Sequence, residues 1–369
     1  MLHLSYLMSI ALSIKAWIYI SSFPDIPLFQ GFTLPPLIEN SVVVLLILSI
    51  TYDMFKPARW RLLFIIGITI VVIIDNYNCF QPWLYFFILI YILKYLSSVG
   101  NKGRDFFLPL LRILLISVYL WAGLNKLNSN FMEFGGPMMF SFFFSETFDD
   151  MPNLISLVIP FGEIALAALL ACNIRRMFVV AHSLILHTLI LLYVSPLNPD
   201  NLNVVVIPWN LFMIYLTIIL STHESRSSLK KLQYSIVSVS FILLTICFPV
   251  LNTFGWGNNT MSFNLYSARG SYYYISYTDE VKDRLDQSNY NLPDSRLDSN
   301  LKGGDLISIN EWSMNTLNIP VVQSNFTKRA ILNQLCPYSV NPESFYFIEA
   351  HKPYSRIKLS KDFHMSQCD

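Results

Sequence analysis

The sequence predicts an all-α polytopic membrane helical bundle of about nine spans, with a small C-terminal α+β domain on the outer face. Only 13% of the 369 residues are charged and 54% are hydrophobic, whereas a soluble domain carries about 25% charged residues. The mean hydropathy of +0.47 reflects long apolar runs, which are typical of membrane proteins. After residue 251, Ser, Asn and charged residues become more frequent. We therefore divide the chain into a transmembrane bundle, 1–251, and an extracytoplasmic domain, 252–369.

Nine apolar stretches are predicted to cross the bilayer, because each approaches the ~20 residues that a spanning helix requires. They are residues 2–22, 39–55, 61–79, 82–98, 106–127, 153–173, 177–195, 203–221 and 233–251. The N-terminus has neither a basic region nor a small-residue cleavage site, so no removable signal peptide is expected. A formal net charge of +1 gives no reason to expect nucleic-acid binding.

The basic residues indicate how these spans are oriented. They follow the second, fourth, sixth and eighth spans: Lys56, Arg59, Arg61, Lys102, Arg104, Arg175, Arg176, Arg226, Lys230 and Lys231. The intervening loops, 23–37, 80–82, 128–152 and 196–202, contain no Lys or Arg. Because basic loops stay in the cytoplasm, we predict a cytoplasmic N-terminus and an extracytoplasmic C-terminus.

The outer side of the protein is predicted to carry its own structure. Alternating aromatic residues predict strands at 272–275 and 345–348, and residues 327–335 are helix-like. Cys336 and Cys368 could form a disulfide if this domain faces an oxidising space. The apolar, acidic loop 128–152 is predicted to dip into the outer interface or to cap the bundle as a re-entrant segment.

The span 106–127 carries polar residues on one face. Arg112, Tyr119, Gly123 and Lys126 are seven, four and three residues apart, so they share one stripe of a helix. Lys126 is either a snorkelling lysine that anchors the helix end or a desolvated lysine that acts as a base.

Glu163 and His187 are predicted to lie near the membrane midplane. Each is ten residues into its span, which is about 15 Å at ~1.5 Å per residue. One interpretation is a structural lock, in which Glu163 pairs with Arg112 or His187. The other is a proton relay or a polar pocket for a head group.

Several chemistries have no signature in the sequence. It contains no P-loop, GxGxxG, HExxH, GxSxG or CxxC motif. His182 and His187 are five residues apart, which does not put both on one helix face, so no metal site is expected. Pro208 lies in a predicted span, and the carbonyl that it frees could be satisfied by Asn210.

Two stretches resemble the DoxX-like membrane proteins. They are LLRILLISVYLWAGLNKL at 110–127, with an early Arg and a final Gly and Lys-Leu, and FGEIALAALLACNIRR at 161–176. The wider group includes the horizontally transferred transmembrane domain and the vitamin K-dependent γ-carboxylase. GLNKLN at 123–128 is similar to the carboxylase segment that carries the catalytic lysine, and FNLYS at 263–267 resembles the start of the outer domain. The likeness covers residues 106–267, with the signature region at 106–195.

The resemblance implies a helical bundle that holds a reduced, vitamin K-like quinone near the outer leaflet. On this match Lys126 takes the position of the lysine base, and His187 falls where the carboxylase has a histidine. Our first hypothesis is thus a quinone-linked enzyme or binder in which Lys126, Glu163 and His187 are catalytic. Arg112, Tyr119 and Gly123 would contact the quinone. The alternative is a non-catalytic scaffold or partner subunit that docks an envelope protein through residues 252–369. A transporter is a third hypothesis, disfavoured because no internal repeat is apparent.

Overall fold

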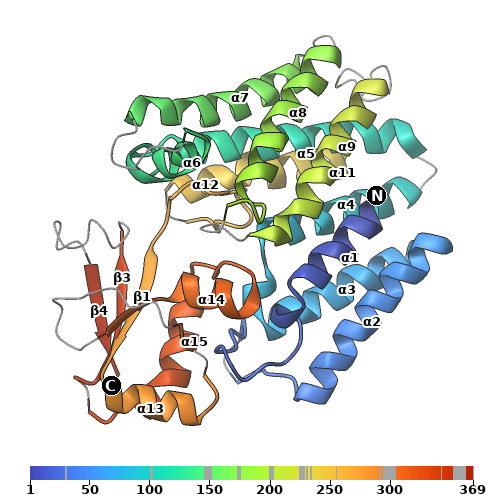
Figure 1. Cartoon of the computed structure of the whole chain (residues 1–369). Coiled ribbons are helices and arrows are strands. Elements are labelled where there is room, and N and C mark those ends of the chain that lie inside the picture. The colour runs from blue at the N-terminus through green and yellow to red at the C-terminus, as the bar shows by residue number, and fades with distance from the viewer. Residues whose placement is uncertain are drawn as a thin grey trace. The chain divides into compact units, whose positions relative to one another are not determined.

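The chain forms two compact units in a computed structural model (Figure 1). The structure describes residues 1–29, 31–99, 103–144, 152–172, 176–198, 203–223, 229, 232, 235–254, 256–290, 292–293, 305–341, 343–351 and 363–368. Unit 1 comprises 1–9, 49–66 and 81–269, and unit 2 comprises 10–48, 67–80 and 270–369. Of the basic residues that suggest the orientation, Lys102, Arg175, Arg226, Lys230 and Lys231 lie outside the described residues.

The helices of the first 253 residues follow the apolar runs of the sequence. They are α1 (Leu2–Leu12), α2 (Pro36–Phe55), α3 (Arg59–Asp75), α4 (Pro82–Ser98), α5 (Gly103–Lys126), α6 (Gly136–Phe144), α7 (Val158–Ala171), α8 (Arg176–Tyr193), α9 (Ile207–Thr222), α11 (Ile236–Ile242) and α12 (Phe248–Thr253). Short 3-10 or π turns join several of them, among them a π turn at Leu243–Cys247 between α11 and α12. Helices α1, α2 and α3 contribute residues to both units.

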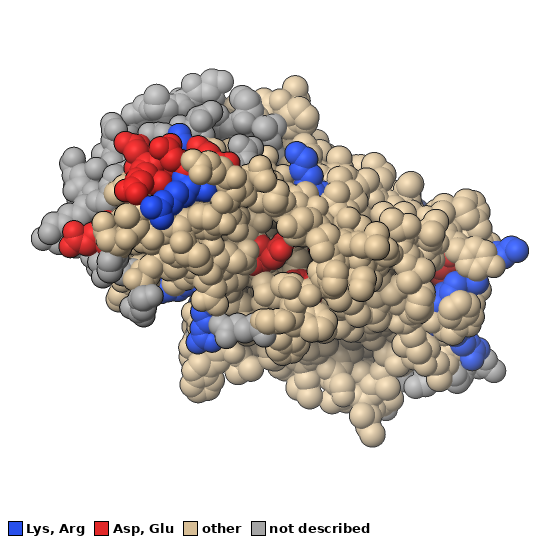
Figure 2. Space-filling model, turned by 90° about the horizontal axis from the view of Figure 1, so that it is seen from below, with Lys and Arg blue, Asp and Glu red and all other residues tan. Residues whose placement is uncertain are grey.

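Six apolar segments in the described part of the chain are long enough to cross a membrane. They are Pro36–Phe55, Asp105–Lys126, Asn153–Ala171, Arg176–Tyr193, Val204–Thr222 and Ile236–Thr253. The predicted spans 2–22, 61–79 and 82–98 correspond to shorter helices of 11, 17 and 17 residues. The chain is therefore a multi-pass membrane protein, and nine spans remain a prediction. Lys, Arg, Asp and Glu are sparse over much of the face in Figure 2.

Helix α5 forms the centre of unit 1. It contacts α4 and α7 and lies between them (Figure 1). Its spanning segment is 83% buried inside the protein, against 22% for that of α8. A helix in this position meets neighbouring helices on most of its faces, so its polar side chains must find partners within the protein.

Helix α5 also supports a break in the last span. Pro249 has no N–H and cannot donate to the carbonyl of Thr245, four residues earlier. The Ser117 hydroxyl donates to that carbonyl, and the indole N–H of Trp121 donates to Ile246 O at 3.1 Å. Two carbonyls of the π turn at Leu243–Cys247 thus accept hydrogen bonds from side chains of α5.

Asp53 joins four helices at one end of unit 1. Its fully buried carboxylate lies 2.9 Å from His3 Nε2 on α1, 3.3 Å from Lys94 Nζ on α4 and 3.5 Å from Arg61 Nε on α3. The backbone N–H of Ala58 donates to it at 3.0 Å. A buried carboxylate with this many donors keeps its charge at low cost.

Unit 2 contains a small antiparallel sheet with helices. Strands β1 (Tyr272–Tyr277), β2 (Asp305–Ser308), β3 (Phe345–Ala350) and β4 (Phe363–Gln367) run in the order β2-β1-β3-β4. Helices α13 (Asp279–Gln287), α14 (Ile309–Leu317) and α15 (Asn325–Leu335) complete it. Both predicted strands and the predicted helix at 327–335 are confirmed. The position of residues 252–369 on the outer face of the membrane remains a prediction.

Segments far apart in sequence build the core of unit 2. The rings of Phe23 and Trp312 meet edge to face at 4.8 Å. The Asn78 side chain donates to Ser313 Oγ at 3.2 Å and accepts from Val322 N at 2.8 Å. Cys336 and Cys368 form a disulfide. The unit therefore includes two loops from the apolar N-terminal part of the chain as well as the polar tail.

Candidate functional site

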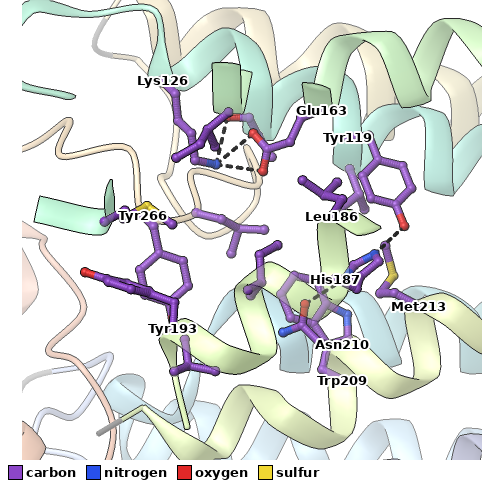
Figure 3. A pocket seen from close by; sticks show the side chains of 17 residues that line it. Tyr119, Lys126, Glu163, Leu186, His187, Tyr193, Trp209, Asn210, Met213 and Tyr266 are labelled. Atoms are coloured by element: carbon purple, nitrogen blue, oxygen red, sulfur yellow. Dashed lines mark hydrogen bonds and ion pairs between the residues drawn. The ribbon is translucent and has the colours of Figure 1, made fainter. Parts of the chain in front are cut away.

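A cavity in unit 1 collects most of the candidate residues. It lies among α5, α7, α8 and α9 and contains about 590 Å³ of space between side chains, counted to its open end. Most of its lining is apolar, for example Val118, Ile159, Leu186 and Met213. The polar side chains at its wall belong to Tyr119, Lys126, Glu163, His187, Tyr193, Trp209, Asn210 and Tyr266. Figure 3 shows Lys126 and Glu163 on one side of the cavity, and His187, Asn210 and Trp209 on another.

Lys126 and Glu163 form a buried ion pair across α5 and α7. The Lys126 ammonium lies 2.9 Å from Oε1 and 2.8 Å from Oε2 of Glu163, and it donates to Ala122 O at 3.3 Å. Only 3% of the Lys126 side chain and 7% of the Glu163 side chain are exposed. Lys126 therefore does not extend to the interface, and the partner of Glu163 is Lys126, not Arg112 or His187.

Gly123 brings α5 and α7 close enough for this pair. A Cβ atom at Gly123 would lie 2.7 Å from the carbonyl oxygen of Pro160 and 2.7 Å from Ile164 Cγ1. Only glycine therefore permits this helix contact, one turn before Lys126. Gly123 and Arg112, which is buried, do not line the cavity. The helical stripe that we predicted thus divides: Tyr119 and Lys126 reach the cavity, and the other two lie elsewhere.

Tyr119, His187 and Asn210 form a hydrogen-bonded chain. The Asn210 amide nitrogen donates to Val206 O at 2.9 Å, at the start of α9, which points its oxygen toward His187 Nδ1, 2.8 Å away. His187 Nδ1 must therefore carry the proton, and Nε2 must be the acceptor. The Tyr119 hydroxyl lies 2.7 Å from Nε2 and donates to it. This network fixes a neutral histidine beside the cavity.

His182 does not join this network. Its Nε2 lies 2.8 Å from the carbonyl oxygen of Gly162, so it hydrogen-bonds to the backbone of α7 instead. No group of three or more His, Cys, Asp or Glu residues suited to a metal ion occurs among the described residues.

A loop that follows the last span closes part of the cavity. The Asn125 amide donates to Ser262 O at 2.9 Å, and the Asn128 amide donates to Ser267 O at 2.8 Å. The chain turns sharply there, with a φ of 48° at both Phe263 and Tyr266, and Leu265 and Tyr266 line the cavity. Burial raises the pKa of Tyr266 well above its usual range, so its hydroxyl stays protonated.

The loop 128–152 also contributes to this site. Its described part forms a π turn at Phe131–Gly135 and then α6, and Met139 of α6 lines the cavity. Glu146, Asp149 and Asp150 of this loop lie outside the described residues.

Sequence reasoning missed several lining residues. Trp209, Tyr193, Leu265 and Tyr266 line the cavity, yet none of them shares a helical stripe with Lys126. One signal was present: Trp209 lies between Pro208 and Asn210, a polar start to an otherwise apolar helix.

The family model of the methylamine utilisation protein MauE matches residues 104–197. This stretch includes α5 to α8 and carries Tyr119, Lys126, Glu163 and His187. No curated protein and no solved structure matches the chain. The match agrees with a multi-pass membrane protein, and it is to a family other than the DoxX-like proteins.

Proposed function

We propose that this membrane protein binds a quinone or hydroquinone in the cavity among α5, α7, α8 and α9. The observation that carries the proposal is the buried Lys126–Glu163 pair at the wall of an otherwise apolar cavity. Apolar walls with a few convergent polar groups are typical of small-molecule sites. A quinone suits such walls, because it has a flat apolar ring and two carbonyl oxygens. The resemblance to the DoxX-like and carboxylase group supports the same ligand class.

The ion pair suggests how the roles are divided. A hydroquinone, when bound, supplies an acidic O–H group. The Lys126 ammonium already holds its proton, so the Glu163 carboxylate is the group that can accept one. As Glu163 takes up the proton, its hold on Lys126 weakens, and the ammonium can then stabilise negative charge nearby. The Lys126–Glu163 pair would therefore share the role of base that the sequence hypothesis assigned to Lys126 alone.

His187 and Tyr119 offer a second place for a proton. Nε2 of His187 is an acceptor that the Tyr119 hydroxyl holds in position. If the Tyr119 oxygen accepts a proton from the ligand, the Tyr119 hydroxyl proton can pass to Nε2 of His187. Both residues lie beside the cavity, which supports a role in proton transfer within the membrane.

We place the N-terminus in the cytoplasm and residues 252–369 in the extracytoplasmic space. The alternation of basic and non-basic loops supports this orientation. The Cys336–Cys368 disulfide is also consistent with an oxidising compartment.

The test is a quinone assay on the full chain purified in detergent. Lipid extracts of the wild type, Lys126→Ala and Lys94→Ala are analysed by mass spectrometry, with folded yield checked by size exclusion. Lys94→Ala is the matched control, because its ion pair with Asp53 lies outside the cavity. We expect near-stoichiometric quinone in the wild type and control, and a loss in Lys126→Ala. A folded wild type without quinone, and unable to bind added quinone, would instead favour the scaffold that docks an envelope protein.

A further inference from the structure

The indole N–H of Trp209 is a buried donor that is not used by the fold. Trp209 lines the cavity and is 5% exposed. Its Nε1 atom is shielded from solvent and has no hydrogen-bond partner in the part of the chain that the structure describes. Buried polar groups are normally paired, and an unpaired one lowers stability. An unpaired buried donor is most easily tolerated where a bound ligand supplies the missing acceptor.

A second tryptophan in the same unit shows the ordinary case. Trp121 is 7% exposed, and its indole N–H donates to Ile246 O at 3.1 Å. Among the described residues, Trp312 in unit 2 also has no partner for its indole nitrogen, but it does not line this cavity. Trp209 therefore combines an unused donor with a place at the cavity wall.

The donors of Lys126, Tyr119 and His187 at the wall are already used. The three N–H groups of Lys126 have three acceptors: Oε1 and Oε2 of Glu163 and the carbonyl of Ala122. The Tyr119 hydroxyl donates to His187, and His187 Nδ1 donates to Asn210. A ligand that bonds to the Trp209 N–H would break no internal hydrogen bond of the described residues.

We propose that the indole N–H of Trp209 donates to a carbonyl oxygen of the ligand. This inference rests on the proposed quinone function and narrows it, because it requires a ligand with an acceptor oxygen on its ring. The hydrogen bond forms before any proton moves, whereas Lys126 becomes available only when Glu163 releases it. Trp209 thus favours ligands that carry a ring carbonyl, and the Lys126–Glu163 pair stabilises negative charge that develops on the ligand.

The experiment compares wild type, Trp209→Phe and Trp121→Phe, each as the full chain in detergent. The probes are decylubiquinone and menadione, titrated by fluorescence quenching. Both variants lose one indole N–H and keep an aromatic ring, so Trp121→Phe is the matched control. Trp209→Phe should weaken binding by about threefold to tenfold, as expected for one hydrogen bond. Trp121→Phe should bind as the wild type does.

Two further readouts separate a ligand contact from a structural role. Infrared spectra with carbonyl-labelled quinone should show one carbonyl stretch lowered in the wild type and restored in Trp209→Phe. Without ligand, Trp209→Phe should melt at the same temperature as the wild type or higher, because it removes an unpaired donor. Trp121→Phe should melt lower, because Ile246 O loses its donor.

The outcomes are distinguishable. If the wild type binds neither probe, the proposed function fails and this inference fails with it. If the wild type binds and Trp209→Phe matches it in affinity and carbonyl frequency, only the inference is overturned. Should Trp209→Phe not fold, the wild type labelled with nitrogen-15 indole decides the question. One of its seven tryptophan N–H signals must then shift downfield on adding quinone, and the absence of such a shift overturns the proposal.

Discussion

The Lys126–Glu163 pair should show strong coupling in a double-mutant cycle of Lys126→Met and Glu163→Gln. The ammonium touches both carboxylate oxygens, at 2.8 and 2.9 Å, and both side chains are almost fully buried. Removing one partner of such a pair costs about 3–5 kcal/mol, because the other charge stays buried. A carboxylate that loses its partner can take up a proton, so we expect about 3 kcal/mol for each single variant.

The double variant should lose far less than the two single variants together. Two neutral side chains of similar volume leave no charge uncompensated, so we expect a loss of about 1 kcal/mol. The coupling energy would then be about 5 kcal/mol, well above the ~0.5 kcal/mol of independent sites. Reversible unfolding by dodecyl sulfate in mixed micelles, followed by tryptophan fluorescence, measures each value.

Lys94→Met is the control for removing a lysine from the bundle. Its partner Asp53 keeps His3, Arg61 and the N–H of Ala58, and 32% of the Lys94 side chain is exposed. We expect a loss below about 1 kcal/mol. If the losses in the Lys126 and Glu163 variants are simply additive, the buried ion pair does not exist in the folded protein and the site argument is refuted.

Three further changes test other parts of the structure. Gly123→Ala should destabilise the bundle by about 1–3 kcal/mol through overpacking and lower its quinone content. Gly67→Ala is the control and should do neither, because a Cβ there meets none of the described residues within 4 Å. Equal unfolding midpoints for the two variants would contradict the close contact between α5 and α7. Under denaturing conditions the chain should take up three alkyl groups before reduction and five after it, because Cys336 and Cys368 are paired and the other three cysteines are free. Five alkyl groups before reduction would count against the disulfide and weaken the argument for an extracytoplasmic C-terminus. Burial raises the pKa of Asp25 to about 6, so the protonated form is favoured in the folded protein. Stability should therefore fall as pH rises from about 4 to about 6. Asp25→Asn should raise the melting temperature at pH 7 and not at pH 4, and an equal effect at both pH values would refute the raised pKa.

Part of the site was visible in the sequence. Charged and polar residues in apolar spans are rare enough to attract attention, and four of the six residues chosen this way, Tyr119, Lys126, Glu163 and His187, line one cavity. The depth argument also put Glu163 and His187 at a common level. The remaining two, Arg112 and Gly123, share the stripe but lie outside the cavity lining, because a stripe faces more than one neighbour along its length.

Other features depended on how the helices pack. The sequence hypothesis considered Arg112 or His187 as partners of Glu163, and the structure pairs it with Lys126. That choice depends on the rotation of α7 against α5, which the contact at Gly123 sets. In the sequence Trp209 stood out only through its neighbours Pro208 and Asn210, because an indole in an apolar helix is ordinary until its N–H is seen without a partner.

The sequence by itself determined the class of the protein, most of its spanning segments, and the strands and helix that form the core of the polar tail. These follow from composition and local periodicity, which each segment carries alone. Only the tertiary structure decided which polar groups meet and that loops near Phe23 and Asn78 join unit 2. It also decided that Leu265 and Tyr266 line the cavity, in a loop that Asn125 and Asn128 hold through Ser262 and Ser267. Those features are contacts between segments distant in sequence, and no single segment contains the information that places its partner.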